Sequence, residues 1–289
     1  MTQRRKKTVR GRRLSMELKR LREAAGLSGE QAASRLQWSQ SKVSRIETGR
    51  IAVSNKDLRA LLDLYQVPQD KRDRCFELAK GAKIKGWWEA YADAIPRDYA
   101  DYIELENAAC SVLTYSPQIV SGVLQTEEYA QRVVQSALLI SPPGEVARRV
   151  KVRMERQERL MSDHARTLSV VLDEAALQRH VGGPKVMEEQ LRHLVSLAEQ
   201  PNLTVRVLLS ASGEHPATAG EFTILKFPDS DDTDVVHVEA MTSSLYVEEE
   251  AEVFRYVLAF NQLCSMALSP SESTALITEL ADGERRQGR

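Results

Sequence analysis

Apolar residues recur every three or four positions over residues 14–80, which is the spacing of helices that bury one face. The first repeat stops at Gly26, and glycine closes many helices because it adopts a left-handed backbone easily. A second helix is expected after Ser28, whose side chain can form a capping box with Gln31. The apolar positions of these two helices are Leu14, Leu18, Leu21, Ala25, Ala32, Ala33 and Leu36.

A third short helix is predicted from a capping Ser39 to Gly49. Val43 and Ile46 would hold this helix to the domain. Because the second helix is lined with small alanines, the third could cross it closely, as in a helix-turn-helix, and protrude on its far side. Its outward positions carry only hydrogen-bonding residues, namely Gln40, Ser41, Lys42, Ser44 and Arg45.

The same spacing predicts a fourth helix over 55–65, closed by Pro68, and a fifth around residues 76–79. Farther along, helices are expected over 104–116, 126–139, 144–162, 184–199, 248–267 and 271–280. Short runs rich in Val, Leu, Ile and Phe predict strands over 168–172, 204–209, 222–227 and 235–239. The fold class is therefore an all-α N-terminal domain followed by an α+β domain, a mixed sheet with helices packed on it.

The second half of the chain contains a charged helix and a cluster of aromatic residues. The helix over 144–162 carries charges at helical neighbour spacing, which we interpret as a solvated face. They belong to Arg149, Arg153, Glu155, Arg156 and Arg159. An aromatic cluster that would pack a domain entry or a partner surface consists of Trp87, Trp88, Tyr91, Tyr99 and Tyr102.

The composition is that of an ordinary globular protein. Of the 289 residues, 42% are hydrophobic and 28% charged, and the length suggests two domains. No apolar run approaches the roughly 20 residues that cross a bilayer, and none follows the basic N-terminus to form a signal peptide. We therefore expect a cytoplasmic protein with no membrane partner. The cysteines, which lack disulfide or zinc-ribbon spacing and are expected as free thiols, are Cys75, Cys110 and Cys264.

Charge is segregated along the chain. Residues 1–85 contain 22 Lys and Arg against 9 Asp and Glu, a net charge of +13, whereas residues 86–289 carry −14. A half so basic favours a polyanionic partner, and the acidic half would limit non-specific spreading over it. Residues 1–13 have no apolar periodicity, so they are expected to form a flexible basic arm.

A resemblance to the XRE (Cro and phage-repressor) family lies in residues 27–50, LSGEQAASRLQWSQSKVSRIETGR. It rests on Ser39, Ser41, Val43, Ser44, Ile46, Glu47 and Gly49. The resemblance implies a lambda-repressor-like domain whose third helix enters the major groove of double-stranded DNA. The residues expected to meet base edges are Gln40, Ser41, Ser44 and Arg45. Those expected at phosphates, or in the arm near a minor groove, are Lys42, Arg50, Arg4, Arg5, Lys6 and Lys7.

The chain departs from the family pattern at two positions. The family often has a phosphate-contacting glutamine where this chain has Gly29, which weakens one expected backbone contact. It often has a glycine where this chain has Gln37, which suggests that residue 37 need not adopt a strained backbone angle. Glu47 is acidic, so we expect it to bond within the domain and not to DNA.

A second resemblance covers nearly all of the acidic half. It rests on Tyr102-Ile103-Glu104-Leu105-Glu106, the run VSGVLQTEEYA at 120–130, Arg153 with Arg156-Gln157, Leu172-Asp173-Glu174-Ala175, Gln190-Leu191, Val205-Arg206-Val207-Leu208 and Val236-His237-Val238-Glu239. These segments resemble the C-terminal domain of unknown function in a group of actinomycete XRE regulators similar to WhiJ. The group is described as antitoxin-like, because members are often encoded beside a small partner protein. A proline usual in the group is replaced by Ser121.

Catalysis is the less favoured interpretation of the acidic half. His237 and Glu239 are spaced to face the same side of a strand, while Asp173, Glu174 and His215 fall at strand ends or loops. Such groups could serve a metal or an acid–base reaction. No zinc-protease motif, nucleophile elbow or phosphate-binding glycine loop accompanies them. We therefore assign no catalytic residue, cofactor or metal, and expect no enzyme.

Taken together, the sequence predicts a flexible arm over 1–13, a helix-turn-helix domain over 14–80 and a regulatory domain over 83–289. The expected function is that of a transcription regulator, a repressor that binds DNA as a homodimer. A small protein from a neighbouring gene is the first-ranked partner of the C-terminal domain. A small-molecule effector and a purely dimerising role remain as alternatives, with a metal-dependent or acid–base enzyme less favoured.

Overall fold

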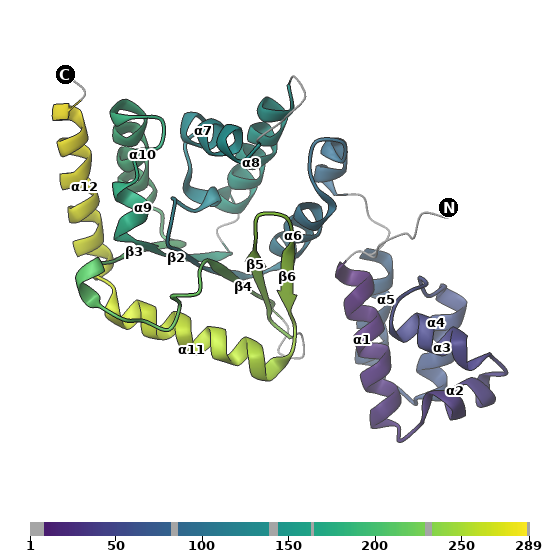
Figure 1. Ribbon diagram of the computed structural model, residues 1–289. Coiled ribbons are helices and arrows are strands. Elements are labelled where there is room, and N and C mark those ends of the chain that lie inside the picture. The colour runs from purple at the N-terminus through teal and green to yellow at the C-terminus, as the bar shows by residue number, and fades with distance from the viewer. Residues whose placement is uncertain (1–8, 82–85, 139–143, 163–164, 229–232, 288–289) are drawn as a thin grey trace. The chain divides into compact units, whose positions relative to one another are not determined.

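The computed structural model describes residues 9–81, 86–138, 144–162, 165–228 and 233–287 (Figure 1). The chain divides into two compact units, Met1–Glu89 and Ala90–Arg289. A helical N-terminal region and a C-terminal mixed sheet with helices confirm the expected fold class. None of the helices in the described part of the chain is long and apolar enough to cross a membrane.

Helices α1 to α5 form the N-terminal unit, and the caps that the sequence predicts are present. They span Val9–Ala24, Gly29–Leu36, Gln40–Glu47, Asn55–Leu64 and Gln69–Gly81. Ser28 and Gln31 form the reciprocal capping box of α2, and Ser39 caps α3 by accepting from the Lys42 amide. All five helices share one buried core, in which the largest fully buried side chains are Leu18, Ile46, Leu58, Leu61 and Leu62.

The prediction of a flexible arm over 1–13 is wrong for residues 9–13, which are helical. Residues 9–13 belong to α1, where the Ser15 hydroxyl donates to the Gly11 carbonyl at 3.0 Å. The physical reason is that arginine is a good helix former, so a basic segment without apolar periodicity can still extend a helix that is anchored farther along. The arm residues Arg4, Arg5, Lys6 and Lys7 lie outside the described residues.

The expectation for residue 37 is wrong. Gln37 closes α2 in the left-handed region, at φ 57° and ψ 36°. Its amide donates to the Ser34 carbonyl and the next amide donates to the Ala33 carbonyl, so the chain turns sharply toward α3. The geometry of the turn fixes the backbone angle here, whatever residue occupies the position.

Replacement of Gln37 by glycine is therefore expected to stabilise the N-terminal unit by roughly 0.5–1 kcal/mol. A left-handed backbone costs a residue with a Cβ about 1–2 kcal/mol, and the greater freedom of glycine in the unfolded chain offsets part of the gain. Thermal unfolding measures the difference. Gln37→Ala is the matched control, because it removes the exposed side chain but keeps the Cβ; equal stabilities of the two variants would contradict the strain.

A six-stranded sheet organises the C-terminal unit, in the order β3-β2-β1-β4-β5-β6. The strands β1 to β6 span Ser111–Ser116, Thr167–Asp173, Leu203–Leu208, Phe222–Lys226, Val235–Glu239 and Ser244–Val247. The pairs of β1 with β2 and of β2 with β3 are parallel, whereas β4 and β5 pair with their neighbours in antiparallel fashion. The mixed sheet that the sequence favours is confirmed.

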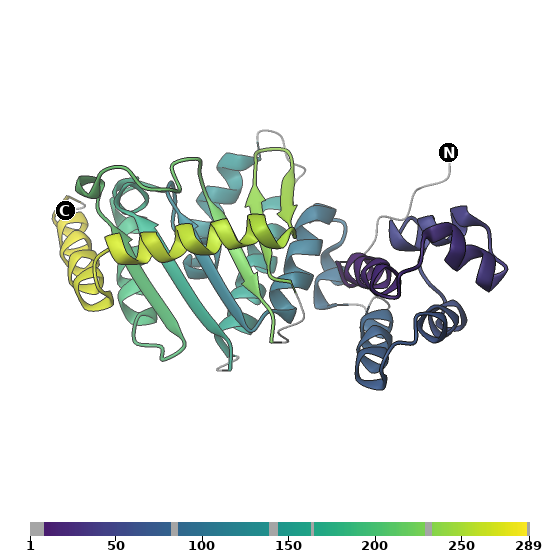
Figure 2. The same cartoon turned by 90° about the horizontal axis from the view of Figure 1, so that it is seen from below.

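Helices cover both faces of this sheet. One face is crossed by α11, Glu250–Met266, as seen from below in Figure 2. Figure 1 shows α7, α8, α10 and α12 on the opposite side. The helices α6 to α10 and α12 span Arg97–Ala108, Glu127–Ala137, Glu145–Ser162, Glu174–Gln178, Pro184–Leu197 and Pro270–Gln287. Short 3-10 turns lie at Trp87–Tyr91, Gly122–Leu124 and Ser210–Ser212.

Two strands were not foreseen. Only the first part of the helix expected over 104–116 is helical, because α6 ends at Ala108 and Ala109 is extended at φ −74° and ψ 143°. Residues 111–116 form the central strand β1 instead. This strand gains its hydrogen bonds from β2 and β4, partners that are distant in sequence. The edge strand β6 was also missed, because it is only four residues long.

Candidate functional site

Helix α3 presents a polar face away from the core of the N-terminal unit. Val43 and Ile46 are each only 1% exposed and attach the helix to the core. The four residues predicted to meet base edges are all exposed: Gln40, Ser41, Ser44 and Arg45. The predicted outward face of this helix is therefore the one that the structure leaves open to a partner.

The two basic residues predicted at phosphates on this unit differ in their surroundings. Arg50 is exposed just after α3. Lys42 is half-buried, because its Nζ lies 2.8 Å from Oδ1 of Asp57 and 3.6 Å from the centre of the Trp38 ring. One of the three N–H donors of Lys42 is therefore already bound to Asp57, whose carboxylate also offsets the charge that a phosphate would meet. Arg45 lies along α3 itself, with its Nε donating to the Ser41 carbonyl at 3.1 Å.

A buried ion pair fixes the end of α3 to α1. Arg22 donates from Nε and Nη2 to the two carboxylate oxygens of Glu47, at 2.7 and 3.0 Å. Its Nη1 donates to the Leu27 carbonyl at 2.7 Å. The side chains of Arg22 and Glu47 are only 10% and 9% exposed. The expectation that Glu47 bonds within the domain is confirmed, and this bond positions the residues of α3 that precede it.

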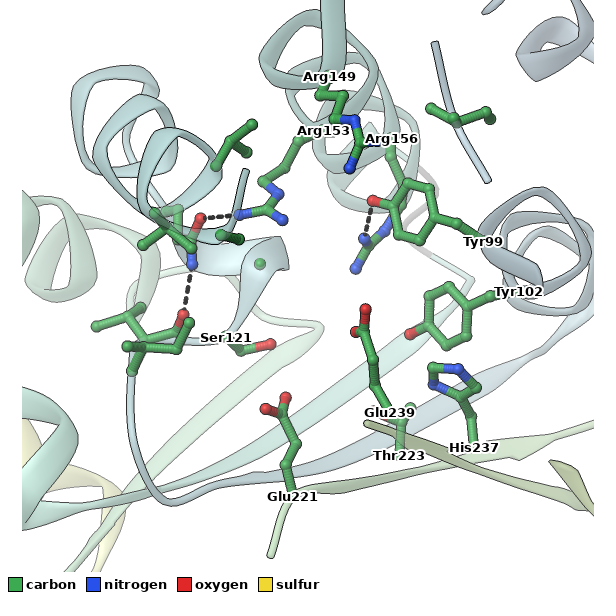
Figure 3. A pocket seen from close by; sticks show the side chains of 18 of the residues that line it. Tyr99, Tyr102, Ser121, Arg149, Arg153, Arg156, Glu221, Thr223, His237 and Glu239 are labelled. Carbon is green, nitrogen blue, oxygen red and sulfur yellow. Dashed lines mark hydrogen bonds between the residues drawn. The ribbon is translucent and has the colours of Figure 1, made fainter. Parts of the chain in front are cut away.

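A second candidate site is a cavity of about 220 Å³ within the C-terminal unit (Figure 3). Its walls come from α6, the turn at 122–124, α7 and α8, and its floor comes from β4 and β5. Three arginines of α8 line one wall: Arg149, Arg153 and Arg156. The interpretation of these arginines as a solvated face is wrong, because the tertiary fold turns this side of α8 toward the sheet.

The innermost of these arginines belongs to a buried network. Arg156 is 8% exposed, and its Nε lies 2.7 Å from Oε2 of Glu106, which is 1% exposed, at an angle outside that of a hydrogen bond. Nη1 of Arg156 donates to the Tyr99 hydroxyl at 2.7 Å. The Tyr102 hydroxyl donates to the other oxygen of Glu106 at 2.8 Å. Two charges, both buried, thus join α6 to α8.

Acidic and imidazole groups line the opposite side of the cavity. Glu221 is solvent-accessible inside it, but the surrounding walls reduce its access to bulk water, and this desolvation raises the pKa of its carboxyl to about 7. His237 is 7% exposed, and its burial, with repulsion from Arg156, lowers the pKa of its imidazole to about 4. His237 is therefore uncharged near neutral pH. It lies between the rings of Tyr102 and Tyr246, whose centres are 4.5 and 5.0 Å away.

The sequence anticipated part of this cavity. His237 and Glu239 do face it from β5, as their spacing predicted. Asp173 and His215 lie outside the cavity, where both side chains are within hydrogen-bonding distance of the Tyr115 hydroxyl. Glu174 is also outside it, and its carboxylate accepts a hydrogen bond from the Ser210 amide at 2.9 Å. No three His, Cys, Asp or Glu side chains within the described ranges converge as metal ligands. No local pattern marked Glu221 or the inward face of α8, because only the fold brings these segments together.

These features define the class of protein: a helix-turn-helix domain with an open third helix, followed by an α+β unit that encloses a charged cavity. Residues 13–75 match the family described as "Helix-turn-helix domain", which indicates DNA binding and a role in regulating transcription. Residues 99–279, more than half of the chain, match the family "Domain of unknown function (DUF5753)". The chain belongs to this family. No curated protein and no solved structure was found to match the chain.

Proposed function

We propose that the protein is a sequence-specific transcription regulator of the XRE class, a repressor that binds double-stranded DNA in the cytoplasm as a homodimer. The observation that carries this proposal is the face of α3: Gln40, Ser41, Ser44 and Arg45 are exposed together, while the opposite side of the helix is buried. Glutamine and arginine side chains form paired hydrogen bonds with adenine and guanine in the major groove. Two copies would place their third helices at half-sites about 34 Å apart.

Arg45→Ala tests base recognition. Binding to the preferred duplex is expected to weaken by roughly 1–3 kcal/mol, and discrimination at one base pair of each half-site should be lost, because a paired contact to a base edge disappears. The preferred duplex is first selected from a random-sequence library with the full chain. The matched control is Arg20→Ala, which removes an exposed arginine of α1. An unchanged base preference in the Arg45 variant would overturn the assignment of this face.

Arg50→Ala tests phosphate contact. We expect weaker binding to every duplex alike, and a slope of log affinity against log salt concentration that is less steep by about one. Fluorescence anisotropy across a salt series measures both quantities. Lys42→Ala should have a smaller effect on this slope, because Lys42 is already bound to Asp57. A loss confined to one DNA sequence would contradict a phosphate role for Arg50.

The proposed role of the C-terminal unit is to control DNA binding. The resemblance to the WhiJ-like group favours a small protein from a neighbouring gene as the partner. One observation supports a protein contact: Phe254 and Leu258, 59% and 51% exposed, lie four residues apart on α11. DNA binding would be measured with and without that small protein, for the wild type and for Phe254→Ser. An effect of the small protein that survives this substitution would contradict a contact through Phe254. We propose no enzymatic activity.

A further inference from the structure

From the charges that face each other across the cavity of the C-terminal unit, we infer that it binds a small zwitterionic metabolite with an apolar body, of the amino-acid type. The cavity separates basic groups of α8 from acidic groups of the sheet, and apolar side chains complete its lining. The inference concerns binding by this unit. Its consequence for DNA would rest on the proposed function.

The basic wall offers a site for an anionic group. Arg153 is half-buried and points into the cavity, where one Nη donates to Oε1 of Gln125 at 2.6 Å. Among the residues that the structure describes, no carboxylate lies within 4.0 Å of its guanidinium. Arg153 and Arg156 converge on Gly122, since atoms of both guanidinium groups lie within 3.8 Å of where its Cβ would be. A carboxylate or phosphate suits this paired geometry.

Arg149, the third arginine of this wall, already has a counterion, so Arg153 is the arginine left to bind an anionic group. Arg149 pairs with Glu145 at 2.6 Å, and its Nε donates to the Ala94 carbonyl at 3.1 Å. A partly desolvated guanidinium without a counterion is unfavourable, because a buried charge needs a partner. An anionic ligand group would provide that partner for Arg153.

The sheet side offers a site for an ammonium group. Glu221 and Glu239 point from the sheet toward the arginines, and neither is within ion-pair distance of a basic group among the described residues. The carboxylates are close enough that the charge of Glu239 disfavours ionisation of Glu221. The buried Nε2 of His237, which also lines the cavity, has no hydrogen-bond partner. A ligand cation would relieve the repulsion, and a ligand N–H or O–H group could satisfy the imidazole.

The apolar part of the lining and the volume of the cavity set the character and size of the ligand. The apolar residues come from three segments of the chain: Ile95, Pro96, Ile119, Val120, Val133, Val134 and Ala137. A cavity of about 220 Å³ is smaller than the roughly 300–1,000 Å³ of pockets for drug-sized ligands. A site for an anionic group, a site for an ammonium group and apolar lining residues together fit a small metabolite that carries an anionic group, a cationic group and an apolar body.

Isothermal titration of the full chain tests the inference. The probes are the common L-amino acids and the ω-amino acid 5-aminopentanoate, and each that binds is compared with analogues lacking one charge. For leucine these are 4-methylpentanoate and 3-methylbutylamine. We expect at least one zwitterion to bind at least tenfold more tightly than both of its single-charge analogues. Failure of every zwitterion to bind, or equal binding of a single-charge analogue, would overturn the inference.

Matched variants locate the site. Arg153→Gln is expected to weaken zwitterion binding at least tenfold, whereas Lys151→Gln, which removes an exposed charge from the same helix, should leave it unchanged. Glu239→Gln should weaken binding of the zwitterion but not of its acid analogue. Unchanged zwitterion affinity in both the Arg153 and the Glu239 variant would place the ligand elsewhere. DNA binding is measured separately, so that a failure of the proposed regulation is distinguished from a failure of ligand binding.

Discussion

Replacement of Glu47 by alanine is expected to lower the free energy of unfolding of the helix-turn-helix unit by about 3–5 kcal/mol. The substitution leaves the guanidinium of Arg22 buried without the carboxylate that accepts its bonds at 2.7 and 3.0 Å. Whole domains are stable by only about 5–15 kcal/mol, so this loss is a large fraction of the total. Because the pair ties α3 to α1, the variant should also bind DNA poorly, although Glu47 faces the interior of the unit.

Denaturant unfolding of the full chain, followed by tryptophan fluorescence, measures this loss. All three tryptophans, Trp38, Trp87 and Trp88, belong to the N-terminal unit. Glu23→Ala is the matched control, since Glu23 contacts the same guanidinium at 3.4 Å but is 56% exposed. An exposed pair contributes roughly 0–1 kcal/mol. Equal losses in the two variants would show that burial of the Arg22–Glu47 pair has no special importance.

DNA binding separates the structural role of Glu47 from direct contact. We expect the folded fraction of Glu47→Ala to keep the base preference and the salt dependence of the wild type, with weaker apparent affinity as the temperature approaches unfolding. A changed base preference at a temperature where the variant is fully folded would instead indicate that Glu47 acts at the DNA surface.

Replacement of Glu106 by glutamine is the second change for which we expect a large effect, a loss of about 3–5 kcal/mol in the stability of the C-terminal unit. Glutamine has nearly the same shape and can still accept the hydrogen bond of the Tyr102 hydroxyl. The charge of Arg156 would then be buried without its counterion. Calorimetry measures the loss, and hydrogen exchange of α6 and α8 assigns it to the helices that the pair connects.

A double variant separates charge from packing. Glu106→Gln combined with Arg156→Met leaves no buried charge in the network, so it should recover most of the stability that the single variant loses. If the double variant is as unstable as Glu106→Gln alone, packing around these side chains, and not the unpaired charge, is responsible.

The N-terminal unit shows how far local signals extend. The capping box of Ser28 and Gln31 and the burial of Val43 and Ile46 depend on residues within one or two helical turns, so the sequence predicted them correctly. The outward face of α3 followed from the same periodicity. Gln37 was misjudged because the tight turn before α3 imposes a left-handed backbone on a residue that disfavours it.

The C-terminal unit shows where local signals fail. Strand β1 was expected as helix, because its hydrogen bonds come from β2 and β4, which lie more than 50 residues away in the chain. Arg153 and Arg156 have the spacing of a solvated helical face, and nothing nearby in the sequence distinguishes them from one. Their environment depends on α6 and on the sheet.

The sequence by itself determined the helix-turn-helix, its capping residues, the residues on the open face of α3 and the mixed composition of the second half, since periodicity, capping and charge are local properties. The tertiary structure alone decided which charges are buried and which face one another. Glu106 meets Arg156, and Glu221 and Glu239 face the arginines of α8, because a sheet assembled from distant strands brings them together. Burial and electrostatic partners are properties of neighbours in space, which sequence separation does not encode.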